Sequence, residues 1–221
     1  IIVQKMVFYF TSLSHPKDAV IYMGADKFEN EHLIEFSFPK DIWFHVEHLS
    51  SAHVYLRLEG LADIDSIPQE LIDEMCQITK ANSIEGSKKK EVGIVYTFAE
   101  NLLKEDDMEV GAVYFKKPKA KRYLHCIAKN KEILNPIRKT KIEAFPDLKE
   151  AYNTKMFELK KEAQGKKTAA RVEAKKQEVD AKDFKKKILN EKRLKEKEFE
   201  DFFNKDDEEK KEVDDAADDF W

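Results

Sequence analysis

After Pro146 the chain of 221 residues contains no proline, and Gly165 is the only glycine in that part. Of residues 151–200, 26 are charged, and several acidic residues stand four positions before a basic one. Pairs at that spacing stabilise an exposed helix by about 0.2–0.5 kcal/mol each. The apolar spacing is not sustained over the roughly three to four heptads of a coiled coil. We therefore predict a long charged helix over residues 131–205, with at most local coiling.

Charge is sorted along the chain, although the whole sums to only −4. Residues 151–200 hold 16 basic and 10 acidic side chains, a net charge of +6, whereas residues 201–221 hold 3 and 10, a net charge of −7. The acidic composition of residues 206–221 predicts a disorder-prone tail. That tail ends in Phe220 and Trp221, to which we assign no role. The 151–200 helix is suited to holding a protein partner.

The clearest strand signal is an alternation of apolar and polar side chains in two neighbouring segments. The apolar positions are Ile42, Phe44, Val46, Val54, Leu56 and Leu58. Because successive side chains of a strand point to opposite faces, these residues are predicted to form one buried face. The other face then carries flat rings and donors, namely Trp43, His45, His53, Tyr55 and Arg57. We expect that face to be exposed or to line a groove.

Further strands and helices are predicted around this pair from their composition and from the turn-forming residues that bound them. The predicted strands are 6–11, 20–23, 92–97, 111–115 and 123–128, and the predicted helices are 30–36 and 68–82. This order predicts an α/β (α+β) domain over residues 6–130, with a central sheet of about six strands. We expect no strand after residue 131.

Several classes of function lack their sequence signature. Two cysteines, Cys76 and Cys126, exclude a disulfide scaffold and a cysteine-based zinc site. The side chains of Asp41, His45, His48 and His53 would suit a metal, but their spacing matches no metal signature. There is no GxxxxGK[ST] loop, no GxGxxG motif, and no nucleophile elbow at the neighbouring serines. We predict no enzyme, no cofactor, no metal site and no membrane span, and we expect a cytoplasmic location, with a nuclear pool as the alternative.

Two basic loops stand beside aromatic residues. One is Lys88, Lys89 and Lys90; the other has five basic residues in seven, namely Lys116, Lys117, Lys119, Lys121 and Arg122. Bases stack on aromatic rings while lysine and arginine meet phosphates, so the combination favours contact with nucleic acid. These residues alone do not separate RNA from DNA.

Several segments resemble the coiled-coil domain-containing protein 25 family, in order, from residue 6 to about 150. They include Met6-Val7-Phe8-Tyr9-Phe10-Thr11-Ser12, Asp41-Ile42-Trp43-Phe44-His45-Val46, Leu49-Ser50-Ser51-Ala52-His53-Val54-Tyr55-Leu56-Arg57 and Met108-Glu109-Val110-Gly111. Members of that family have an NFACT-R domain followed by a charged helical tail. The resemblance implies an RNA-binding domain without catalytic activity, of a kind shared with ribosome-associated quality-control proteins.

The resemblance also implies particular site residues. The Asp41-x-Trp43-x-His45 strand and the turn Ser50-Ser51-Ala52 with His53 match family signature positions, and Lys27 and Asn30 lie in its earlier loop. Together with the basic loops, the predicted nucleic-acid site is Lys27, Asn30, Trp43, His45, Ser51, His53, Tyr55, Arg57, Lys88, Lys89, Lys90, Lys116, Lys117, Lys119, Lys121 and Arg122. Broader NFACT-R domains often have glycine in that turn. This chain also lacks the NFACT modules that recognise tRNA, so a tRNA-elongating role is not carried over.

The leading hypothesis is a non-enzymatic, ribosome-associated protein that binds structured RNA, with a link to translation, ribosome quality control or dormancy. One alternative is a protein-interaction scaffold that acts through the charged helix. Another is a protein that binds DNA or polyanions in general.

Overall fold

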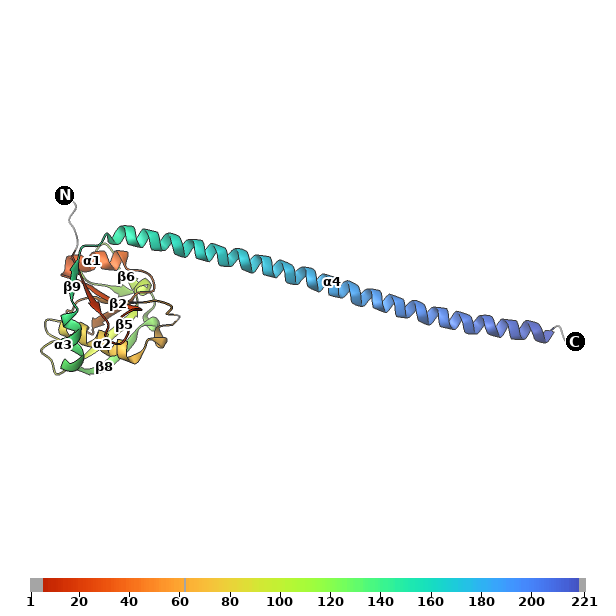
Figure 1. The fold of residues 1–221 in the computed structure, drawn as a ribbon, viewed down its shortest axis with the longest axis horizontal. Coiled ribbons are helices and arrows are strands. Elements are labelled where there is room, and N and C mark those ends of the chain that lie inside the picture. The colour runs from red at the N-terminus through yellow and green to blue at the C-terminus, as the bar shows by residue number, and fades with distance from the viewer. Residues whose placement is uncertain (1–5, 62, 219–221) are drawn as a thin grey trace. The chain divides into compact units, whose positions relative to one another are not determined.

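The computed structural model describes residues 6–61 and 63–218, with side chains as far as residue 199. Its first compact unit is built on a seven-stranded antiparallel sheet, in the order β8-β5-β3-β4-β2-β1-β9 (Figure 1). The strands are β1 (Val7–Thr11), β2 (Ala19–Gly24), β3 (Ile42–Val46), β4 (Val54–Leu58), β5 (Glu91–Phe98), β8 (Arg122–Ala128) and β9 (Ile142–Ala144). A separate ribbon pairs β6 (Leu102–Leu103) with β7 (Tyr114–Phe115).

The helices differ in length and in role. They are α1 (Lys27–Phe36), α2 (Gln69–Ala81), α3 (Lys131–Lys139) and α4 (Leu148–Asp218), with short 3-10 turns η1 (Ile64–Ser66), η2 (Ala99–Asn101) and η3 (Pro118–Ala120). The mixed α and β class predicted from the sequence is confirmed. Within the described residues, none of these helices has the length and apolar character that crossing a bilayer requires.

One face of the sheet packs against α2 and α3. Ile42, Phe44 and Val46 of β3 are fully buried there, against Met75 of α2 and Ile137 of α3. Strands β3 and β4 pair. Five of the six apolar positions predicted for this face are fully buried, and the sixth, Leu58, is half-buried against the same core.

The second face of the sheet is also covered, so of the two arrangements expected for it, an exposed face or a groove wall, the exposed face is wrong. Only 2% of the Trp43 surface and none of the Tyr55 surface is exposed. The cover comes from Leu33 of α1, Leu102 of β6 and Phe115 of β7, and Leu148 packs against the same cluster. These segments are distant in sequence from β3, so its alternation could not reveal them.

The chain between residues 131 and 148 also differs from the prediction. A helix was expected to run on from residue 131, but α3 ends at Lys139 and the long helix begins at Leu148. Between them β9 adds an edge strand beside β1, with Ile142 opposite Tyr9. Three residues of pairing leave no pattern to detect. The first compact unit extends to Phe157, beyond the expected domain end at residue 130.

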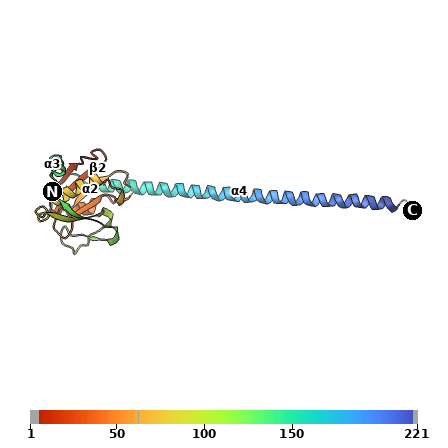
Figure 2. The same cartoon turned by 90° about the horizontal axis from the view of Figure 1, so that it is seen from below.

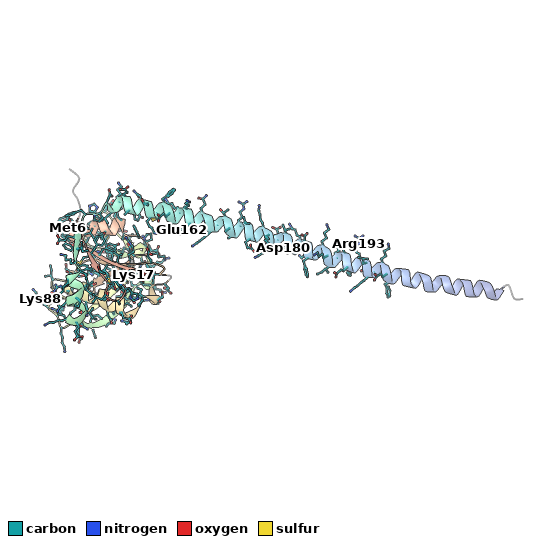
Figure 3. The ribbon with its side chains drawn as sticks, viewed as in Figure 1. Met6, Lys17, Lys88, Glu162, Asp180 and Arg193 are labelled. Atoms are coloured by element: carbon teal, nitrogen blue, oxygen red, sulfur yellow. The ribbon has the colours of Figure 1, made fainter. Side chains whose placement is uncertain are left out.

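Helix α4 is continuous (Figures 1 and 2). Side chains such as Glu162, Asp180 and Arg193 project from it into solvent (Figure 3). Lys182 binds Glu178 one turn earlier at 2.7 Å, as the charge spacing predicted. The predicted acidic tail ends outside the described residues, and its side chains are not described; its disorder stays a prediction.

Candidate functional site

A cavity of about 310 Å³ lies on the second face of the sheet, beside β3, β5 and β8. His45 on β3 lies opposite Val95 on β5, and Val95 lies opposite Tyr123 on β8. Opposed residues of antiparallel strands share a face, so the sheet register brings these side chains together. The lining includes Trp43, His45, His53, Phe115, Lys121 and Tyr123.

The rings of this lining contact one another. Trp43 stacks nearly parallel on His45, with 5.3 Å between ring centroids and 9° between planes. His53 and Phe115 meet Trp43 edge to face, at 5.3 and 5.8 Å. Trp43 is therefore a packed core residue that also forms part of a cavity wall, and not an open stacking platform.

Two of the three histidines that line the cavity, His45 and His53, are neutral at physiological pH. Burial lowers the pKa of His53 to about 3, against a weaker opposing effect of a hydrogen bond to the Gly111 backbone. Burial also lowers the pKa of His45. The Val46 carbonyl can only accept a hydrogen bond, so His45 Nδ1 carries the proton and donates to it at 2.7 Å. These rings therefore offer hydrogen-bonding groups and not positive charge.

Two buried polar atoms of the cavity wall have no hydrogen-bond partner among the described residues. They are Trp43 Nε1, which can only donate, and His53 Nδ1. A buried polar group left without a partner costs about 1–3 kcal/mol. Such groups are uncommon in folded proteins, and each calls for an explanation.

Lys121 connects the cavity to the basic loop 116–122. Its ammonium nitrogen lies 4.4 Å from the ring centroid of Phe115 and 5.3 Å from that of Tyr123. Lys117 and Lys119, in the same loop, have exposed side chains. The loop therefore presents cations beside a ring-lined cavity, the combination that the sequence predicted.

Two other basic residues of this loop have structural partners. Arg122 binds Asp65 through two contacts of 2.7 Å, and Lys116 donates to the Glu100 carbonyl at 2.8 Å. Their charges are partly engaged, so Lys117 and Lys119 are the more available cations.

Arg57 is held away from the cavity by Asp41. The Arg57 guanidinium donates two hydrogen bonds to this carboxylate, at 2.9 and 2.7 Å, and lies 3.5 Å from the Phe38 ring centroid. Asp41 is 1% exposed and also accepts from the Tyr22 hydroxyl. The Asp41 position of the signature strand therefore joins neighbouring strands, whereas Trp43 and His45 line the cavity.

Four more predicted residues do not line the cavity. Tyr55 and Asn30 are buried, and Ser51 Oγ accepts from the Val46 amide and donates to the Ala52 carbonyl. The ammonium group of Lys27 lies 5.3 Å from the centroid of its neighbour's ring, Phe28. The Ser51 contacts stabilise the turn.

The other basic loop lies apart from this cavity. Lys88, Lys89 and Lys90 precede Glu91, the first residue of β5, whereas Arg122 pairs with Tyr96 near the last. At about 3.3 Å per residue, five residues of strand separate the two ends by about 17 Å. Lys88 lies at the rim of the folded unit (Figure 3). The buried Lys80 anchors this loop by donating to the Lys89 carbonyl at 2.9 Å.

Sequence reasoning missed the segment 104–113, of which Gly111, Ala112 and Val113 line the cavity. Lys104 Nζ binds Glu31 at 2.9 Å and donates to the Glu109 and Ala112 carbonyls at 2.7 and 3.1 Å. Glu31 also accepts from the Gly111 amide. Gly111 adopts a φ of 86°, which favours glycine. The one signal was the Met108–Gly111 motif, which gave no indication of a position over Trp43.

Comparison with known proteins identifies the domain. Residues 6–117 match the family described as "NFACT protein RNA binding domain". The chain is 51% identical over 144 residues to coiled-coil domain-containing protein 25 of Mus musculus, covering 65% of this chain and 69% of that protein. It is 44% identical over 143 residues to the Dictyostelium discoideum homolog, covering 65% and 68%.

More distant similarities extend the comparison. Protein JLP2 of Saccharomyces cerevisiae is 38% identical over 153 residues, which cover 67% of this chain and 74% of that protein. The solved C-terminal part of the fibronectin/fibrinogen-binding protein from Streptococcus suis aligns with a TM-score of 0.48 and 17% identity, over 61% of this chain and 48% of that one. From the domain match and the 44–51% identities, the chain belongs to the coiled-coil domain-containing protein 25 family and carries its NFACT-R domain.

Proposed function

We propose that this protein binds RNA through the cavity of the second sheet face together with the basic loop 116–122, without catalysing a reaction. The observation that carries the proposal is the position of Lys121, which lies over Phe115 and Tyr123 at the cavity. Rings and cations at one place meet the two needs of single-stranded or looped RNA, which are stacking for bases and positive charge for phosphates. The NFACT protein RNA binding domain match supports the same function.

A charge-reversal experiment tests this proposal. Lys117→Glu with Lys119→Glu removes two exposed cations whose side chains make no hydrogen bond to the residues that the structure describes. Log affinity falls as log salt rises, and each lost phosphate contact makes this negative slope shallower by about 0.7 on a single strand. Fluorescence anisotropy with a labelled RNA hairpin, at several salt concentrations, measures that slope.

The matched control reverses two lysines of α4. Lys185→Glu with Lys186→Glu changes the net charge equally, on the exposed 151–200 stretch. We expect the loop variant to lose affinity and slope, and the helix variant to keep most of both. Equal losses in the two variants would contradict a localised site and favour general polyanion binding.

Association with the ribosome is the finer part of the proposal. It is supported by the RNA binding domain, since an RNA-rich particle offers structured RNA at high local density. Sucrose-gradient sedimentation of the native protein, with and without RNase, tests it. Co-sedimentation that RNase treatment abolishes is expected; a protein that stays at the top of both gradients would refute it.

A scaffold role for α4 is the second candidate. Large apolar side chains such as Phe157, Phe184 and Leu194 are 71%, 65% and 61% exposed. A protein partner would cover them. Pull-down with the loop variant separates the two functions, because a partner held by α4 should still be captured when RNA binding is lost.

A further inference from the structure

We propose that the cavity binds one unstacked nucleobase, whose edge pairs with the Trp43 indole N–H and with His53 Nδ1. This inference rests on the proposed RNA-binding function and assigns the chemical class that the cavity takes. Its basis is the combination of two features, a cavity and two buried, unpartnered polar atoms that belong to residues lining it.

The two atoms call for polar groups on a ligand. Trp43 Nε1 can only donate a hydrogen bond, so its partner must be an acceptor. His53 Nδ1 belongs to a neutral ring and donates or accepts according to the tautomer of that ring. Every nucleobase carries both acceptors and donors on its hydrogen-bonding edges and can therefore satisfy both atoms.

The environment of these atoms favours a base over a phosphate. Trp43, His45 and His53 are uncharged at neutral pH, so they would leave a phosphate deep in the cavity without a counter-charge. Lys121, which lies over the Phe115 and Tyr123 rings, can meet the phosphate attached to a bound base. At about 310 Å³ the cavity lies at the small end of ligand sites, of roughly 300–1,000 Å³.

Access to the two atoms requires the covering segment to move. Both atoms are closed off from solvent, and Gly111 and Val113 are part of the cavity wall. The segment is held by the Lys104–Glu31 ion pair and by the hydrogen bond from the Gly111 amide to Glu31. Val113 also packs against the second-face cluster, and a hydrogen bond links the Gly111 backbone to His53. To open the site, residues 104–113 must release these few contacts, all of which lie outside the ladder of the sheet.

Tyr55 provides a matched control for Trp43. Its hydroxyl is also buried and without a partner among the described residues, but Tyr55 does not line the cavity. Trp43→Phe removes the N–H and keeps an aromatic ring, and Tyr55→Phe removes a polar atom from the same sheet face. Only the first change should affect recognition of a base.

The experiment compares RNA hexamers of each base with a hexamer of the same phosphates that lacks bases. Stacking and edge contacts predict at least tenfold tighter binding of one or more base-containing hexamers. Trp43→Phe should reduce that preference about fivefold or more and leave the affinity for the baseless hexamer unchanged, while Tyr55→Phe keeps the preference. Thermal melting confirms that each variant is folded.

A variant that keeps Trp43 makes the test decisive if Trp43→Phe fails to fold. In a Trp221→Phe background Trp43 is the remaining tryptophan, and a base that enters the cavity should change its fluorescence, whereas the baseless hexamer should not. Equal affinity for hexamers with and without bases overturns the base pocket and leaves the RNA-binding proposal standing. Absence of binding to any RNA overturns the proposed function itself.

Discussion

Replacement of His53 by glutamine should remove an acid sensitivity from the stability of the domain. Burial lowers the pKa of His53 to about 3 in the folded protein, whereas an imidazole in the unfolded chain titrates at about 6.5. Below pH 6.5 His53 binds a proton in the unfolded chain but stays unprotonated in the folded protein. The stabilisation is therefore complete above pH 6.5 and is lost progressively as the pH falls toward 3.

The size of the effect follows from the difference between the solution pH and the pKa of histidine in the unfolded chain. Each pH unit below 6.5 is worth about 1.36 kcal/mol per histidine that stays neutral in the fold. Between pH 7 and pH 5 the free energy of unfolding should therefore fall by about 2 kcal/mol through His53 alone. His45, whose pKa burial also lowers, contributes in the same direction in both proteins and largely cancels in the comparison.

Urea unfolding at pH 7 and at pH 5 provides the measurement. The Trp221→Phe background makes Trp43 fluorescence a probe of the folded unit, where Trp43 is buried. His53→Gln should reduce the loss between the two pH values by about 2 kcal/mol, while His125→Gln, a change at an exposed position of β8, should leave it unaltered. The same pH dependence in wild type and His53→Gln would refute the neutral, buried state of this ring.

Three further predictions concern the core, the signature strand and α4. Trp43→Ala should destabilise the folded unit by about 3–5 kcal/mol in thermal or urea unfolding, because Trp43 is 2% exposed; a variant as stable as wild type would contradict its core position. Asp41→Asn should lower the free energy of unfolding by about 3 kcal/mol in the same assay, since it leaves the partly buried Arg57 without its carboxylate. An equal loss of stability in Arg57→Met and in the double variant would confirm that the two residues act as a pair. Residues 151–200 as a peptide should be helical and monomeric, because ion pairs occur without a continuous apolar seam; a clear dimer in analytical ultracentrifugation would show that seam to exist.

The local sequence determined the elements of the site and the sides they face. Alternation in residues 42–46 and 54–58 was sufficient to place Phe44 in the main core and Trp43 on the other face, because the period of a strand is a local property. Helical charge spacing likewise predicted α4, since i,i+4 pairs depend only on neighbours along one helix. The basic loop beside Tyr123 was visible for the same reason.

Tertiary structure alone decided what covers those faces and which charges remain available. Leu102, Val113 and Phe115 pack in the cluster around Trp43, and nothing in the sequence of β3 predicts that these residues pack there. From the sequence, Arg57 and Arg122 are predicted to bind nucleic acid. In the structure they form ion pairs with Asp41 and Asp65, which lie 16 and 57 residues away along the chain. Coverage and ion pairing are contacts between segments distant along the chain, and their free energy arises only when the sheet register brings those segments together. The short β9 strand could not be predicted for the same reason, because it forms only where β1 presents an unpaired edge.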